Sequence, residues 1–244
     1  GLKRLVDRVH QASEGETRLF IQLIDFLSIK RRPSEETFFH RYFKLDDRHR
    51  SMLVERDGDA GWRGADERAV RQKILEGGAS LWADLLTSRE RRDLHYGYRE
   101  EVNDLHHEHI RTLPQVLPSL FADATSRAER AGFDGVELHC AHAYTLASFL
   151  SETNSRTDGY GGDFSGRLRL PLEVYHAVRQ RVSADMVVGC RILTEEVIEG
   201  GSSIETTSRY AVELARAGMD FISTSKGGRF EDALQPKVGQ AAYP

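Results

Sequence analysis

The sequence has few cysteines and no long apolar run, and each shortage excludes a class of protein. Its 244 residues include only two cysteines, Cys140 and Cys190, so we expect no disulfide framework and a reducing, cytoplasmic location. No stretch reaches the roughly 18 apolar residues that a bilayer-spanning helix requires. The segment 1–18 is amphipathic and polar, and it lacks the apolar centre of a secretory signal peptide.

The chain also lacks a large excess of charge of either sign. Its 34 basic and 38 acidic side chains give a formal net charge of −4, which offers no overall electrostatic case for binding nucleic acid or a membrane. The length suits one large α/β domain better than two independent domains. We therefore expect neither nucleic acid nor a membrane as its partner.

Four short apolar segments predict buried strands near Phe20, Val136, Val188 and Ile222. Helical patterns separate the later strands, and the segments 130–134 (RAGFD) and 216–220 (RAGMD) each end a helix just before a strand. Gly132 is expected to cap one helix, whereas Ser165 and Ser202 are expected to begin two others. Repeated strand–helix units of this kind indicate a parallel sheet covered by helices.

The repeated units favour a (β/α)8 TIM barrel, with an open doubly wound sheet as the second possibility. Four strands are half of what a barrel needs, so we expect an incomplete barrel whose first and last strands are missing from the chain. A polar stretch at about 30–112 predicts helical turns and loop inserted into this single partial domain, 1–244. Insertions of that length usually shape a binding site or an interface.

Polar residues follow the apolar segments at the edge where the active site of a barrel forms, namely Gln22, His139, Arg191 and Ser223. The permanent charge of Arg191 requires an anionic partner: an internal glutamate, which is slightly favoured, a substrate carboxylate or a reduced flavin. The amide of Gln22 can bind the edge of a flavin pyrimidine ring or bridge buried groups equally well.

His139, His142 and Tyr144 lie close together just past a predicted strand. Two imidazoles that donate to one carbonyl oxygen would polarise an enone toward hydride addition, and the tyrosine could supply a proton. The histidines could equally be loop residues bonded to nearby backbone, and the tyrosine could be a packing residue. A metal site is the weaker interpretation because no third ligand has suitable spacing.

These segments in order resemble the Old Yellow Enzyme family of FMN-dependent NAD(P)H:flavin oxidoreductases, which includes 2,4-dienoyl-CoA reductases. The resemblance lies in AGFDGVELHCAHAYTLASFL (131–150), NSRTDGYGG (154–162), GRLRLPLEV (166–174) and VVGCR (187–191), with an added match at 20–23. It implies a flavin-type TIM barrel that binds FMN and uses NAD(P)H as reductant. The implied reaction passes hydride through the flavin to an activated alkene, such as an enone or enoyl compound.

The resemblance also implies a role for each matching residue. Gln22 corresponds to the glutamine that binds the flavin ring, and Arg191 to the arginine beside flavin N1 and O2. His139 and His142 correspond to the pair that binds the substrate oxygen, and Tyr144 to the proton donor. No metal site is implied.

The sequence departs from the family at several points. Asp25 stands where a histidine is usual, and the loops that hold the FMN phosphate are expected to lie outside this chain. Because those loops are expected to lie outside the chain, one alternative function is a non-catalytic interaction or assembly module that associates with itself or with a partner. A second alternative is a metal-dependent hydrolase that uses His139 and His142.

Overall fold

The computed structural model describes residues 1–28 and 33–227. Its contacts divide the chain into two compact units, a sheet unit of Gly1–Leu27 with Glu101–Pro244 and a helical unit of Ser28–Glu100. The sequence predicts one domain with an insertion at about 30–112. The second unit ends earlier, because residues 101–112 belong with the sheet.

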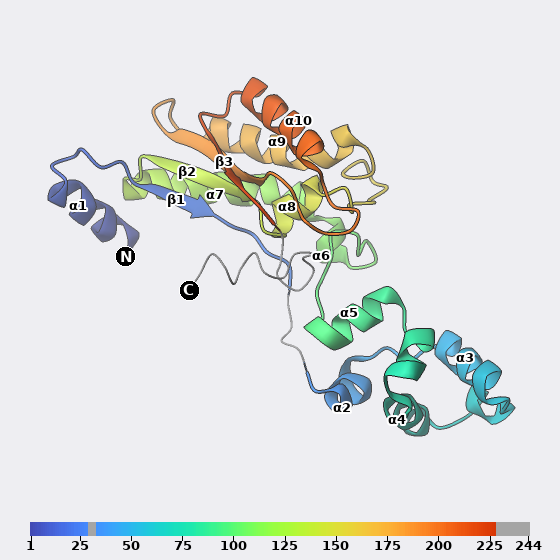
Figure 1. The fold of residues 1–244 in the computed structure, drawn as a ribbon. Coiled ribbons are helices and arrows are strands. Elements are labelled where there is room, and N and C mark those ends of the chain that lie inside the picture. Colours follow the sequence, from blue (N-terminus) through green and yellow to red (C-terminus); the bar gives the residue numbers. More distant parts are fainter. Residues whose placement is uncertain (29–32, 228–244) are drawn as a thin grey trace. The chain divides into compact units, whose positions relative to one another are not determined.

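The sheet unit contains four parallel strands in the order β1-β2-β3-β4 (Figure 1). The strands are β1 (Phe20–Leu23), β2 (Gly135–Cys140), β3 (Val187–Leu193) and β4 (Ile222–Ser225). In the register of the sheet, Gln22 lies beside Glu137, and His139 lies beside Arg191. The four strands predicted near Phe20, Val136, Val188 and Ile222 are therefore confirmed.

The helices of this unit are α1 (Leu2–Ala12), α6 (Glu108–Arg111), α7 (Leu113–Ala131), α8 (Thr145–Leu150), α9 (Phe164–Arg181) and α10 (Ile204–Arg216). No helix in the described ranges is long and apolar enough to cross a membrane. Gly132 ends α7 with a φ of 90°, in the left-handed conformation that glycine adopts without strain.

Two predicted helix starts are wrong by one or two residues. Asp163, not Ser165, caps α9 and accepts a hydrogen bond from the Gly166 amide. Ser203, not Ser202, caps α10, while Ser202 bonds to the carboxylate of Glu196. Each start has two capping side chains close together in the sequence, so the choice between them depends on the path of the chain.

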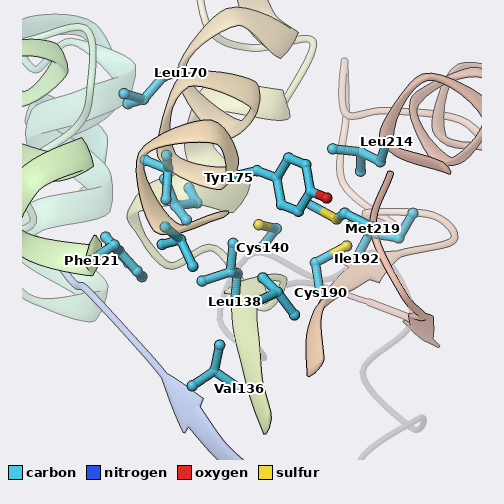
Figure 2. Close-up of a cluster of buried hydrophobic side chains, with 14 of the residues drawn as sticks. Phe121, Val136, Leu138, Cys140, Leu170, Tyr175, Cys190, Ile192, Leu214 and Met219 are labelled. Atoms are coloured by element: carbon cyan, nitrogen blue, oxygen red, sulfur yellow. The ribbon is translucent and has the colours of Figure 1, made fainter. Parts of the chain in front are cut away.

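A single apolar core joins the sheet to α7, α9 and α10. Phe121 of α7, Tyr175 of α9 and Leu214 of α10 all pack toward the same face of the strands (Figure 2). The strand residues in this core are Val136, Leu138, Cys140, Val188, Cys190 and Ile192. Because successive strand residues alternate between faces, the residues between them lie on the opposite face.

The strand order distinguishes the two architectures that the sequence left open. Each described crossover, through α7, α9 or α10, leads to the next strand in the same direction, and all three helices pack on one face. A doubly wound sheet reverses direction at a switch point and carries helices on both faces. The described strands therefore have the α/β class and winding of a TIM barrel and are consistent with part of one.

The helical unit contains α2 (Glu35–Thr37), α3 (Asp47–Asp57), α4 (Glu67–Leu85) and α5 (Ser88–Tyr96), with a π-helical turn at Phe38–Tyr42 and a 3-10 turn at Ala60–Arg63. It has an apolar core of its own, in which Phe39, Leu53 and Ile74 are fully buried. Gly58 ends α3 and Gly78 kinks α4, both at positive φ.

Candidate active site

The face of the sheet opposite the helices carries a row of polar side chains. Gln22 Nε2 of β1 donates to Glu137 Oε1 of β2 at 2.5 Å, and Arg191 Nε of β3 donates to the same oxygen at 3.0 Å. Arg191 Nη2 lies 3.4 Å from Glu137 Oε2. Glutamine, glutamate and arginine from three neighbouring strands therefore form one connected row.

Glu137 is the partner of both predicted cofactor residues, and the sequence analysis did not identify it. Of the three partners considered for Arg191, the structure places the internal glutamate within hydrogen-bond distance. The sequence does contain a signal for this residue, because a charged side chain at the centre of the apolar run GVELHC is unusual. Burial alone would raise the pKa of Glu137, but hydrogen bonds from Ser223, Arg191 and Gln22 outweigh it and lower that pKa.

The three predicted catalytic residues lie together at the carboxyl end of β2. The ring of His139 is 5.4 Å from that of His142 and 5.0 Å from that of Tyr144, measured between ring centres. His142 occupies a turn with a φ of 56°, and its Nε2 lies 3.0 Å from the hydroxyl of Ser225. Tyr144 begins α8 as its N-cap residue.

Burial favours the neutral form of both histidines. Burial lowers the pKa of His139 to about 4, and the nearby His142 and Arg191 add to the effect. Burial also lowers the pKa of His142, against a hydrogen bond with the Gly227 backbone that raises it. A neutral imidazole has one nitrogen that donates and one that accepts, so each ring has a single hydrogen bond to donate.

His139 carries a buried polar atom for which the described residues provide no partner. Its side chain is 4% exposed, and Nδ1 has no hydrogen-bond partner there. The buried Oγ1 of Thr145, which directly follows Tyr144, is in the same condition. Buried polar atoms of this kind are costly in a folded protein unless a ligand or water completes them. Their position at the strand end makes this edge of the sheet the candidate binding site.

The loop after β1 is tied to the start of α8. The backbone N–H of Thr145 donates to the carbonyl of Asp25 at 3.0 Å. The ring of Phe26 lies 6.3 Å from that of Tyr144 and remains 66% exposed. An exposed aromatic ring therefore borders Tyr144 at the open edge of the site.

The loop 154–162 is held in place by the side chain of Arg156. Arg156 pairs with Asp158 and donates to the backbone carbonyls of Val102, Ile110 and Arg111. These bonds fix the loop to residues 101–112, which explains why that segment belongs to the sheet unit.

A hollow of about 430 Å³ lies away from these residues, at the amino ends of the strands, beside Phe20, Asp134 and Val187. Within the described ranges, no group of three histidine, cysteine or acidic residues could hold a metal ion.

The fold and its polar edge define an α/β protein with a site at the carboxyl ends of parallel strands. Residues 90–242 match the NADH:flavin oxidoreductase / NADH oxidase family, and the chain belongs to that family. The family binds FMN and uses NADH.

This chain matches only a part of the length of each individual relative. A NADH oxidase of Thermoanaerobacter brockii is 41% identical over 108 residues, which are 44% of this chain and 17% of the relative. A NADH:acrylate oxidoreductase of Vibrio harveyi is 34% identical over 119 residues, which are 47% of this chain and 12% of the relative. Among solved structures, morphinone reductase is 36% identical with a TM-score of 0.41, over 46% of this chain and 30% of that protein. The chain thus spans less than a third of each of these proteins.

Proposed function

We propose that this chain carries the substrate side of an FMN-dependent oxidoreductase that transfers hydride from NAD(P)H to an activated alkene. The observation that carries the proposal is the buried His139, whose Nδ1 has no partner among the described residues, beside His142 and Tyr144. The Vibrio harveyi relative is named for acrylate, an alkene conjugated to a carboxylate, which supports this substrate class.

His139 and His142 bind the carbonyl oxygen of the substrate in this proposal. Each neutral ring donates one hydrogen bond, and two such bonds stabilise the negative charge that develops on the oxygen of an enone. Neutral rings suit this task because they donate a hydrogen bond without transferring a proton. Burial favours their neutral form.

Tyr144 supplies the proton that completes the reduction. Its phenol is a weak acid that can protonate the α-carbon once charge has built up there. Its ring stands beside that of His139, so the oxygen-binding group and the proton donor face one substrate.

Gln22 and Arg191 would hold the pyrimidine edge of FMN. When bound, FMN accepts hydride from NAD(P)H and returns it to the β-carbon of the alkene. The row of polar side chains fits this group, because amide and guanidinium groups match the oxygens and nitrogens of that ring.

The experiment that tests this function follows deuterium. The purified chain is supplied with FMN, deuterated NADH and cyclohex-2-enone, and the product is examined by mass spectrometry and NMR. We expect deuterium at the β-carbon and a solvent proton at the α-carbon, with loss of turnover in Tyr144→Phe. Unlabelled enone recovered from a chain that retains FMN would contradict the proposal.

A non-catalytic assembly module is the second proposal. Within the described sheet, β1 and β4 each pair on one side only, and unpaired strand edges can add a strand from another chain. This alternative predicts a stable oligomer that releases no flavin on denaturation. Light scattering that finds a folded monomer would exclude it.

A further inference from the structure

Glu137 lies at the centre of the polar row, on the face of the sheet opposite the helices. The residue is 9% exposed, and its carboxylate lies on β2, between Gln22 of β1 and Arg191 of β3. A hydrogen bond from Ser223 of β4 also reaches it. Donors from all three other strands thus converge on one carboxylate.

These bonds determine how the two flavin-facing side chains can turn. Gln22 commits its NH₂ group to Glu137, which leaves its amide oxygen as the end that can accept a bond from a ligand. Arg191 commits Nε to the same carboxylate oxygen and brings one terminal nitrogen near the other. A glycine, Gly189, lies beside Glu137 on β3, so no side chain separates Glu137 from Arg191.

The carboxylate also sets the charge of the row. The ion pair between Glu137 and Arg191 offsets most of the positive charge that Arg191 would otherwise present. A reduced flavin is more negative than an oxidised one, so an unbalanced arginine would favour the reduced form more strongly.

We propose that Glu137 is a positioning residue that orients Gln22 and Arg191 toward FMN and moderates the positive charge beside the flavin. This inference rests on the proposed function. A purely structural role of Glu137 would leave the midpoint potential of bound FMN unchanged.

The first test compares Glu137→Gln with a matched control. Glu137→Gln keeps the shape of the side chain but removes its charge. Glu196→Gln removes another buried carboxylate of the same unit, one bonded to Ser151 and Ser202 and to none of the flavin-facing residues. Both variants lose a buried charge, and only one of them changes the polar row.

The measurement is the midpoint potential of bound FMN. Glu137→Gln should increase the preference for reduced over oxidised flavin about tenfold, which corresponds to about 30 mV upward for a two-electron couple. Glu196→Gln should leave the potential at the wild-type value. Equal potentials in wild type and Glu137→Gln would overturn the inference.

A second measurement uses the wild-type chain without flavin. Its result therefore does not depend on whether Glu137→Gln folds. Hydrogen exchange at the Nε–H of Arg191 is followed by NMR in the wild-type chain, with the signal assigned through Arg191→Lys. We expect slow exchange, because this hydrogen is bonded to a buried carboxylate; exchange as fast as that of the exposed Arg18 would overturn the inference. If the wild type binds no flavin, the proposed function fails, and this measurement alone decides whether Glu137 orients Arg191.

Discussion

The two faces of the sheet are built from the same strands yet serve different purposes. Along β2, Val136, Leu138 and Cys140 enter the apolar core beneath the helices, while Glu137 and His139 lie on the other face. The side chains on the apolar face are buried against side chains of the helices. The polar face contains two groups that carry charge and a histidine whose Nδ1 has no partner in the part of the chain that the structure describes. Alternation along a strand thus separates the residues that stabilise the fold from those that could bind a ligand.

The largest expected effect comes from the apolar face. Leu138→Ala should lower the free energy of unfolding by about 2–5 kcal/mol, because it leaves a cavity in a closely packed core. Urea unfolding of the purified chain measures this loss. His139→Ala, one residue along the strand, should cost much less, since the ring it removes has an unsatisfied nitrogen. Equal losses would show that the two faces do not divide their roles.

The ion pair on the polar face should contribute a smaller amount. Arg191→Met leaves Glu137 charged and without its cation, and it should cost about 1–3 kcal/mol after allowance for the partial exposure of the arginine. Arg181→Met is the control, because its pair with Asp123 is exposed and should be worth about 0–1 kcal/mol. A similar small loss in both variants would place the Glu137 pair among ordinary surface pairs.

The buried histidine should make stability depend on pH. The pKa of His139 is about 4 in the folded chain against an ordinary 6.5, so the unfolded chain binds more protons between these values. The stability of the wild type should therefore be complete above pH 6.5 and should fall by about 3 kcal/mol relative to His139→Phe as the pH drops toward 4. Urea unfolding at a series of pH values gives the difference, and a constant difference would contradict the burial of a neutral imidazole.

The smallest effect on stability should come from Phe26. Its ring is largely exposed, so Phe26→Ala should change the free energy of unfolding by no more than about 0.5 kcal/mol. The same change should raise KM for an aromatic enone, because the ring beside Tyr144 offers an aromatic surface to the substrate. Val116→Ala, on the exposed side of α7, is the control and should leave KM unchanged.

Much of the fold could be predicted from the sequence because its signals are local. Short apolar runs identify the four strands, and Gly132 identifies the end of α7. The grouping of His139 with His142 and Tyr144 follows from their closeness along the chain. These features depend on residues only a few positions apart.

The remaining features depend on contacts between distant residues. Gln22 and Glu137 are separated by 115 positions, so their hydrogen bond follows from the strand register, which the sequence does not specify. The end of the insertion was misplaced for the same reason, because Arg156 binds residues 102, 110 and 111 to the sheet unit. A polar segment is read as loop until its distant partner is known.

The most direct measurement is a fluorescence titration of FMN with the purified chain. The proposed site predicts saturable quenching by the wild type and several-fold weaker binding by Gln22→Ala, with Leu120→Ala on the exposed side of α7 as an unchanged control. Quenching that is absent, or identical in the wild type and Gln22→Ala, would contradict the assignment of the polar face to the flavin.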